Sequence, residues 1–346
     1  MSSGDEAFGM MFVGVGHPHS RSWWRAFEAT PGVRMLGAYD PDEARLDAFL
    51  ADVGGERRGL DDLGRDDVHA AVVDPRNDEV AGFAAEVLAR GKPFMLEKPG
   101  GANAGEIQVI ANEAAAKGLA VQLGYFLRYA DSVAEVKRML DDGELGTVSM
   151  ARIHAAMPRQ AWEGMGEWFA DPKNIAGMFQ EDACHIVDIG LLLFGQPRAV
   201  IAASSSGAFE TTMREDALVA VFDYGTHLVT LDFTAQEANP WVENWSIEIY
   251  GTDATVRAGM RPEWVERYDE GGFWRPVGTP KPADREESQR LGRLADQEQY
   301  RTGAAGFVAA AKGEAAPLMD VQTGLRVFRM VEAIYQAADS GCRVTM

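Results

Sequence analysis

The stretch Phe94-Met95-Leu96-Glu97-Lys98-Pro99-Gly100-Gly101 has the pattern of a short buried strand that stops abruptly. A proline and two glycines follow the charged pair, and such residues end a strand. Glu97 and Lys98 are therefore predicted to lie at the carboxyl end of a strand, the edge at which open α/β sheets bind ligands. A lysine at that edge can give and take a proton, which an arginine effectively cannot.

On both sides of this stretch, short apolar runs alternate with helical patterns. The alternation predicts repeated βαβ units, and therefore a parallel sheet with right-handed crossovers. The predicted strands are residues 10–15, 33–39, 70–73, 93–96 and 120–123.

After about residue 125 the pattern changes to one helix, around residues 132–140, and then to long segments of strand character. A second, largely antiparallel sheet is the simplest account. Its predicted strands are residues 148–157, 200–205, 217–223, 227–233 and 245–250. Residues 277–299 are polar and rich in both charge signs, so we expect a solvated excursion or a mobile flap there, followed by two closing helices.

Composition limits the partners of the chain. Its 346 residues suffice for two domains, and its formal net charge is −20. Nucleic acid and anionic membrane surfaces require a basic face, so the expected partner is a small molecule. The first residues are not signal-like and no apolar run approaches the roughly 18 residues of a membrane span, so we expect a cytoplasmic protein. Cys184 and Cys342 form no metal-ligand spacing; we expect free thiols and no metal site.

The segment Phe12-Val13-Gly14-Val15-Gly16-His17-Pro18-His19 follows the first predicted strand and precedes a helix. In that context it is a variant of the dinucleotide-binding G-x-G-x-x-G loop. Gly14 permits the tight turn, and Gly16 lets backbone amides approach a pyrophosphate at a helix amino end. His19 stands where a third glycine is usual, so strand and helix are expected to pack slightly further apart.

Asp40 follows the second predicted strand, in the sequence Ala-Tyr-Asp-Pro-Asp. Its carboxylate could accept hydrogen bonds from the adenosine ribose hydroxyls of a dinucleotide, and its charge would repel a 2′-phosphate. The expected cofactor is therefore NAD rather than NADP. The alternative is that Asp40 merely caps the helix that begins nearby.

A second candidate site is the segment 176–195, in which Glu181 and His185 are four residues apart. If the segment is a helix, the two side chains share a face. A carboxylate beside an imidazole can take a proton from a hydroxyl and hold the resulting charge. A lone histidine on an apolar helix is, however, more often a core residue with one satisfied hydrogen bond.

These motifs, in this order, resemble those of the Gfo/Idh/MocA oxidoreductases. The resemblance is carried by Gly14-x-Gly16 with Asp40, by Glu97-Lys98-Pro99, by Trp168-Phe169-Ala170-Asp171-Pro172 leading to Glu181-x-x-x-His185-x-x-Asp188, and by Val331-Glu332-Ala333-Ile334-Tyr335. It implies an amino-terminal Rossmann domain, residues 1–125, and a carboxyl-terminal α/β domain, residues 126–346, with a large, mostly antiparallel open sheet. It also implies NAD(P)-dependent chemistry on a hydroxyl or ketone of a sugar, cyclitol or related polyol, and a homodimer or homotetramer formed through that sheet.

The resemblance further implies roles for individual residues. Lys98 would reach toward nicotinamide and substrate, His185 would transfer the proton, and Glu181 would keep these groups in place. The cofactor-binding residues would be Gly14, Gly16, His17, Pro18, His19, Asp40, Pro75, Asn77, Glu97 and Lys98. The substrate-binding residues would be Lys98, Tyr125, Arg128, Trp168, Glu181, Asp182 and His185.

Some of these roles leave alternatives open. Many relatives carry an aspartate where this chain has Glu181, so either Glu181 or Asp182 could face the substrate, which need not be a simple hexose. Arg128 could hold substrate oxygens or form a structural ion pair across the domain junction. Glu97 is expected to position Lys98 or a backbone amide rather than meet substrate.

The same residues fit three functions. The leading hypothesis is reversible hydride transfer to or from a polyol carbon. The second is transient oxidation, with NAD regenerated in each cycle while a glycosidic bond is cleaved or a centre is epimerised. The third is a dinucleotide-binding regulatory protein without catalysis. Net formation of NADH separates the first function from the second.

Overall fold

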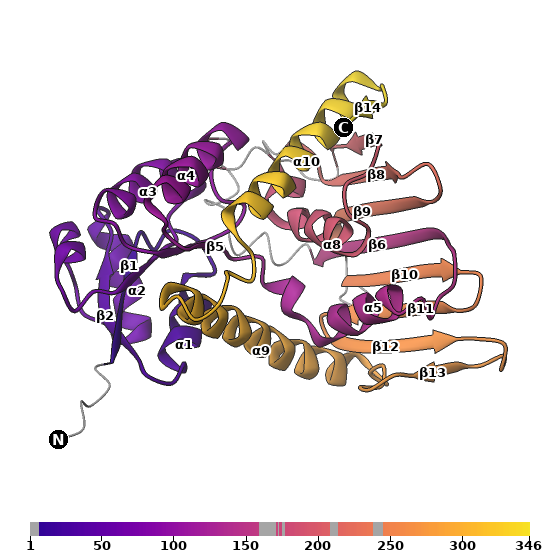
Figure 1. The fold of residues 1–346 in the computed structure, drawn as a ribbon, viewed down its shortest axis with the longest axis horizontal. Coiled ribbons are helices and arrows are strands. Elements are labelled where there is room, and N and C mark those ends of the chain that lie inside the picture. The colour runs from indigo at the N-terminus through magenta and orange to yellow at the C-terminus, as the bar shows by residue number, and fades with distance from the viewer. Residues whose placement is uncertain (1–6, 159–170, 172, 175–176, 208–213, 238–244) are drawn as a thin grey trace. The chain divides into compact units, whose positions relative to one another are not determined.

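The computed structural model describes residues 7–158, 171, 173–174, 177–207, 214–237 and 245–346 (Figure 1). The chain divides into two compact units. One comprises the residues up to Tyr125 together with Tyr300–Arg326, and the other comprises Phe126–Gln299 together with Val327–Met346. Relative to the domain boundaries expected from the sequence, Tyr300–Arg326 groups with the first unit. Within the described ranges, no helix is long and apolar enough to cross a membrane.

The first unit is built on a five-stranded sheet in the order β2-β1-β3-β4-β5, and every neighbouring pair is parallel. The side chains of β1, β3 and β4 are all buried, as expected of strands covered on both faces. The strands are β1 (Phe8–Val13), β2 (Val33–Tyr39), β3 (Ala70–Val73), β4 (Phe94–Leu96) and β5 (Val121–Leu123). Between them run α1 (Ser20–Glu28), α2 (Glu43–Val53), η1 (Leu60–Gly64), η2 (Asn77–Glu79), α3 (Val80–Ala89) and α4 (Ala104–Lys117).

Local sequence determines where two of these helices begin and end. The side chain of Asn103 accepts a hydrogen bond from the amide of Glu106 and so caps α4, and Asp42 caps α2 in the same way. Gly118 and Gly54 then end these helices in the left-handed conformation, with φ of 64° and 76°.

The register of the parallel strands aligns their carboxyl ends. Val13 pairs with Tyr39 and with Val73, and Val73 pairs with Leu96. The residues that follow these strands are Gly14, Asp40, Asp74 and Glu97. The fold therefore gathers the predicted glycine loop and the predicted charged residues at one edge of one sheet, where ligands of such sheets bind.

The second unit contains a nine-stranded sheet in the order β13-β12-β11-β10-β6-β9-β8-β7-β14, antiparallel except for the β6–β9 pair. Helices α5 (Asp131–Asp141) and α8 (Cys184–Phe194) cover one face of it (Figure 1). The strands are β6 (Val148–Pro158), β7 (Ala199–Ser205), β8 (Ala217–Asp223), β9 (Leu228–Glu237), β10 (Trp245–Gly251), β11 (Thr255–Met260), β12 (Glu263–Tyr268), β13 (Trp274–Pro276) and β14 (Val344–Thr345). The predicted fold class, a Rossmann unit plus an α/β unit with a mostly antiparallel sheet, is confirmed.

The expectation of a solvated excursion or flap over residues 277–299 is wrong for most of that segment. A long helix, α9 (Arg285–Ala311), begins inside it, and α10 (Val321–Ser340) follows. Leu291, Leu294 and Ala295 repeat at helical spacing, but most of this part of the helix faces solvent and Leu294 is itself 48% exposed. Strong helix formers such as Glu, Gln, Arg and Leu dominate the segment, so its high charge conceals a helix.

Candidate cofactor and catalytic sites

The glycine loop after β1 has the conformation that its sequence requires. Gly14 has φ of 78°, and a Cβ atom there would lie 2.5 Å from the Cβ of Pro75. A Cβ atom on Gly16 would lie 2.8 Å from the amide nitrogen of Arg76. Only glycine, which has no Cβ atom, allows the loop to pack this close to Pro75 and Arg76. Pro75, which follows β3, thus packs against the glycine loop, and its cofactor-binding role remains a prediction.

Asp40 is buried and its carboxylate is held by three donors. Oδ2 accepts the amide of Val15 at 2.9 Å, while Oδ1 accepts the amide of Asp42 at 2.9 Å and Nη2 of Arg45 at 2.8 Å. The alternative that Asp40 caps the nearby helix is wrong, because the side chain of Asp42 accepts the amide of Arg45 and caps α2. Asp40 instead links the end of β2 to the glycine loop.

Arg45 is a site residue that the sequence patterns do not predict. Its guanidinium bridges Asp40 and Glu79, the second contact being 3.1 Å from Nη2 to Oε1. Burial alone would lower the pKa of Arg45, but the hydrogen bonds to Asp40 and Glu79 raise it instead. Glu79 lies in the short helix η2, which begins at the buried Asn77. The signal in the sequence is a basic residue in the first turn of the helix that follows Asp40.

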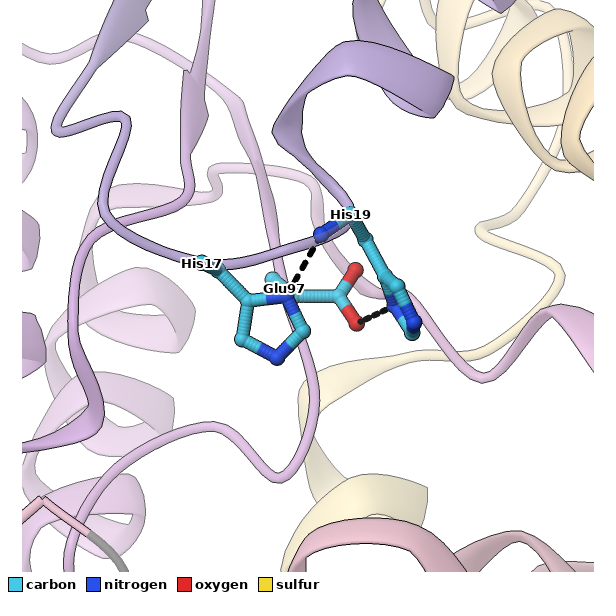
Figure 2. A group of neighbouring side chains, drawn as sticks. All are labelled: His17, His19 and Glu97. Carbon is cyan, nitrogen blue, oxygen red and sulfur yellow. Dashed lines mark hydrogen bonds and ion pairs between the residues drawn. The ribbon is translucent and has the colours of Figure 1, made fainter. Parts of the chain in front are cut away.

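Figure 2 shows a cluster formed by His17, His19 and Glu97 at the carboxyl edge of the sheet. Nδ1 of His19 lies 2.9 Å from Oε1 of Glu97, and Nδ1 of His17 accepts the backbone amide of His19 at 3.1 Å. The other oxygen of Glu97 accepts the indole N–H of Trp23. Trp23 is one helical turn after His19, so both side chains reach the same carboxylate. The rings of His19 and Trp23 also contact Tyr300 edge-on, with centroids 5.9 Å and 4.6 Å away.

The ligand atoms of the His17, His19 and Glu97 cluster all lie within 4.8 Å of one another, close enough to hold a metal ion. A metal would have to replace the hydrogen bond that Nδ1 of His17 accepts and the one that joins His19 to Glu97. The carboxylate would also have to release Trp23 or share an oxygen with it. The contacts of this cluster are those of a hydrogen-bonded network.

The other predicted residues of the first unit are also placed. Lys98 is 1% exposed directly after Glu97, and Tyr125 is fully buried. Pro18 is half-buried in the glycine loop. Glu97 binds the side chains of His19 and Trp23, partners that the sequence patterns do not predict. The cofactor and substrate roles of these residues remain predictions.

In the second unit, Glu181 lies on a π-helical turn and His185 lies on the α-helical turn that follows it. Phe179–Ala183 forms a π-helical turn, η4, and the α-helix α8 begins only at Cys184. Glu181 and His185 are each 3% exposed, whereas Asp182 is partly exposed. The His185 ring packs edge-on against Phe126, with centroids 4.9 Å apart. A π turn within a helix is frequently found at functional sites.

Arg128 and Asp188 form a two-point ion pair. Nε and Nη2 of Arg128 each lie 3.1 Å from one oxygen of Asp188, and the Arg128 side chain is 9% exposed. Both residues belong to the second unit, so this ion pair lies within that unit and not across the domain junction, which was one of the two alternatives. A substrate-binding role for Arg128 remains a prediction, and Trp168 lies outside the described residues.

The π turn is held by a buried network that the sequence patterns do not predict. Oε1 of Glu215 accepts the amide of Phe179 at 2.7 Å and the hydroxyl of Tyr335 at 2.9 Å. The Tyr335 hydroxyl in turn accepts the amide of Gln180 at 3.0 Å. A Cβ atom on Gly177 would lie 2.3 Å from that hydroxyl, so the backbone passes directly over the network. These contacts hold the beginning of the segment that carries Glu181 and His185.

Replacing Glu215 by glutamine is expected to stabilise the protein at alkaline pH. Burial raises the pKa of Glu215 from 4.5 to about 7, against hydrogen bonds from Phe179 and Tyr335 that lower it. Between these values the folded protein holds a proton that the unfolded chain has released, so the stability that this proton contributes is lost as pH rises through about 7. E215Q should raise the free energy of unfolding by about 3 kcal/mol and Tm by about 5 °C at about pH 8.5.

The same substitution should give little or no gain at about pH 5, where Glu215 is protonated in the folded state. Thermal melts of wild type and E215Q at both pH values measure the difference. Glu56, whose side chain is 76% exposed, provides the control substitution E56Q. Equal effects of E215Q at both pH values would show that the buried charge is not the cause.

Comparison with protein families matches both parts of the chain. Residues 8–125 match the description "oxidoreductase family, NAD-binding Rossmann fold", and residues 137–346 match "oxidoreductase family, C-terminal alpha/beta domain". Both descriptions belong to the Gfo/Idh/MocA models, and together they span most of the chain.

Individual proteins agree with this assignment. An inositol 2-dehydrogenase of Rhizobium meliloti is 23% identical over 285 residues, which cover 78% of this chain and 80% of that protein. Inositol 2-dehydrogenase 1 of Saccharopolyspora erythraea is 32% identical over 120 residues, and this match spans 33% of the chain and 36% of that relative. The structure of an oxidoreductase from Agrobacterium radiobacter in complex with NAD+, L-tartaric acid and magnesium shares the fold, with a TM-score of 0.84 at 16% identity over 98% of each chain. Because the family models match both its sheet-containing units, this chain belongs to the Gfo/Idh/MocA family of oxidoreductases.

Proposed function

We propose that this protein is an NAD(P)-dependent dehydrogenase that acts on a hydroxyl or ketone carbon of a cyclitol, sugar or related polyol. The observation that carries the proposal is the sheet edge of the first unit, where Gly14, the buried Asp40 and the pair Glu97 and Lys98 follow neighbouring parallel strands. Membership of an oxidoreductase family, and similarity to inositol 2-dehydrogenases, support the reaction class and the polyol substrate.

The residues around the glycine loop fit a dinucleotide. Gly14 and Gly16 let the loop pack closely against Pro75 and Arg76, and Asp40 stands at the end of β2 where ribose hydroxyls bind in this fold. When bound, the nicotinamide supplies the hydride acceptor or donor. Everything else in the reaction is binding, orientation and proton handling by the protein.

Three residues are assigned to proton handling. His185 removes the proton from the substrate hydroxyl during oxidation and returns it during reduction. Lys98 stabilises the developing oxyanion or relays the proton. Glu181 keeps the side chains of His185 and Lys98 in place. Burial of all three side chains, each 3% exposed or less, supports this assignment, because water-excluded charges and hydrogen bonds act most strongly.

We propose that NAD is preferred over NADP because Arg45 is held by two carboxylates. The two carboxylates of Asp40 and Glu79 carry more charge than the one guanidinium, so this group is negative overall and would repel a 2′-phosphate. Replacing Glu79 by alanine removes one carboxylate and leaves Arg45 able to bind phosphate. The ratio of kcat/KM for NADP to that for NAD is expected to rise about tenfold.

Asp78 provides the matched control for this substitution. It pairs with Arg76 at 3.1 Å and lies next to Glu79, so D78N removes the same charge while the bridge through Arg45 stays intact. Kinetics with both cofactors should show the change in preference for E79A and little change for D78N. Equal changes in the two variants would attribute the preference to general charge and not to Arg45.

A substrate panel tests the proposed function. Purified protein is incubated with NAD and, in separate reactions, cyclitols, sugars, amino sugars and glycosides, while the absorbance of the reduced nicotinamide is followed. The proposal predicts NADH in an amount equal to the oxidised product. Substrate conversion without accumulation of NADH would contradict it and support transient oxidation. NAD binding without turnover of any polyol would support a regulatory protein.

We also propose that the nine-stranded sheet joins copies of this chain. Met150 on β6 pairs with Leu228 on β9 and with Tyr250 on β10, and these three apolar side chains are 41%, 46% and 38% exposed. Val219 on β8 and Ile201 on β7 add 49% and 46% exposed side chains on neighbouring strands. Grouped exposed apolar residues mark interaction surfaces. Sedimentation velocity would test this, and a monomer at all concentrations would refute it.

A further inference from the structure

Three amides of the glycine loop are bound within the protein. A Rossmann loop normally presents its amides, at a helix amino end, to the pyrophosphate of the cofactor. Here the amide of Val15 donates to Asp40 at 2.9 Å, that of His17 donates to the carbonyl of Asp74 at 3.1 Å, and that of His19 donates to Nδ1 of His17 at 3.1 Å. Pro18 has no amide hydrogen. These three amides and Pro18 offer no free donor to an anion, so a side chain at this position can take over part of the anion binding.

The imidazole of His19 is suited to replace these amides. Its Nδ1 lies 2.9 Å from Oε1 of Glu97, and a carboxylate can only accept, so Nδ1 carries the hydrogen. A buried carboxylate beside the ring favours the protonated, positively charged imidazolium. Glu97 is 3% exposed and is fixed on its other oxygen by Trp23, whereas the His19 side chain is 24% exposed. The partly exposed ring can thus contact a ligand while the buried carboxylate of Glu97 stabilises its positive charge.

The groups packed around His19 agree with a single positive charge there. His17, 4.7 Å away between ring centroids, accepts a hydrogen bond at Nδ1, so that nitrogen carries no proton. Tyr300 contacts the ring edge-on from α9, and Glu97 contacts it from the end of β4, where Lys98 follows in the chain. Glu97 is an anion in direct hydrogen-bond contact with the ring, and Oδ1 of the buried Asp74 lies 3.7 Å from Nδ1 of His17.

We propose that the imidazolium of His19, held by Glu97, binds the pyrophosphate of the dinucleotide in place of the loop amides. This inference rests on the proposed function, since it needs a dinucleotide in the loop. It explains why a histidine at the position of the third glycine is compatible with cofactor binding. It also makes cofactor affinity depend on pH, because the ring binds an anion strongly only while it is protonated.

Dissociation constants for NAD, measured by quenching of tryptophan fluorescence between about pH 6 and about pH 9, test the proposal. Wild type should lose about tenfold in affinity as pH rises through this range, the worth of one charge-assisted hydrogen bond. H19Q should bind about tenfold more weakly than wild type at the acid end and show little pH dependence. H19K, which keeps a positive charge throughout, should bind with little pH dependence and more tightly than H19Q.

The control substitution is H69Q, in the same unit. His69 accepts the amide of Gly9 and stacks on Phe8, away from the glycine loop. Its removal should leave the pH dependence of NAD binding unchanged. ADP-ribose, which keeps the pyrophosphate and lacks the nicotinamide, should repeat the behaviour of NAD with wild type and with H19Q.

Several results would overturn the inference. NAD binding by H19Q with wild-type affinity and wild-type pH dependence would refute it while the proposed function stood. If H19Q bound ADP-ribose as tightly as wild type does, the ring would contact another part of the cofactor and not the pyrophosphate. Calorimetric binding of Zn²⁺ alone to wild type, lost in H19Q, would make the ring a metal ligand instead. Failure of wild type to bind NAD at any pH would refute the proposed function and this inference together.

Discussion

Replacing Lys98 by methionine is expected to lower kcat by about a thousandfold, within the range measured for removal of a general acid–base or oxyanion-stabilising group. Methionine keeps the length and the apolar stem of the side chain and removes the ammonium. Lys98 is 1% exposed, so the loss of charge at that position cannot be replaced by bulk water without rearrangement. Initial rates of NADH formation with the best polyol of the substrate panel measure the effect, and thermal melts confirm the fold.

Lys117 provides the matched control for Lys98. Its ammonium pairs with Glu113 in α4, its side chain is 37% exposed, and K117M should leave kcat unchanged. A third variant, K98R, keeps a positive charge that cannot be given up as a proton. If Lys98 only stabilises an oxyanion, K98R should recover part of the activity that K98M loses. Near wild-type turnover of K98M would remove Lys98 from the reaction.

Replacing His185 by asparagine is expected to lower kcat by between about a hundredfold and about a thousandfold. Asparagine retains a hydrogen-bonding group and cannot act as a base. The wild-type rate should fall toward acid pH as the base is protonated, and this fall should be absent in H185N. A change in the pH profile distinguishes loss of a proton carrier from loss of packing against Phe126, which would lower stability alone.

His227 is the control in the same unit. It stacks on Tyr224 with ring centroids 4.6 Å apart, and H227N should keep both the wild-type kcat and the wild-type pH profile. If H185N kept its acid limb and lost only thermal stability, His185 would be the core histidine that the sequence left open as the alternative.

Much of the fold was predictable because the patterns that define it are local. The strands β2, β3 and β8 occupy the residues that their apolar runs predict, 33–39, 70–73 and 217–223. Alternation of apolar runs with helical spacing predicts the parallel sheet, and loss of that alternation after about residue 125 predicts the second one. The prediction of a solvated excursion or flap where α9 begins was wrong because a helix with a mostly solvated surface has the composition of a loop.

The candidate site was predictable in its residue types and not in its contacts. Gly14, Asp40 and the pair Glu97 and Lys98 are identified by their position after strands, because parallel strands end at a common edge. The same reasoning assigned Glu97 to Lys98 or a backbone amide and did not predict its contacts with His19 and Trp23. Its contact with Trp23 joins residues 74 positions apart, and the bridge through Arg45 joins Asp40 to Glu79, 34 positions after Arg45.

By itself, the sequence determined the two sheet-forming halves, the glycine loop and the chemically active residues that follow the strands. Tertiary structure alone decided which side chains meet: Glu97 with His19, Arg45 with two carboxylates, and Glu215 with an amide 36 positions before it and a hydroxyl 120 positions after it. Turn and strand signals act between near neighbours, so they can be read along the chain. Partners and protonation states depend on which distant segments pack together and exclude water, and burial of that kind exists only in the folded molecule.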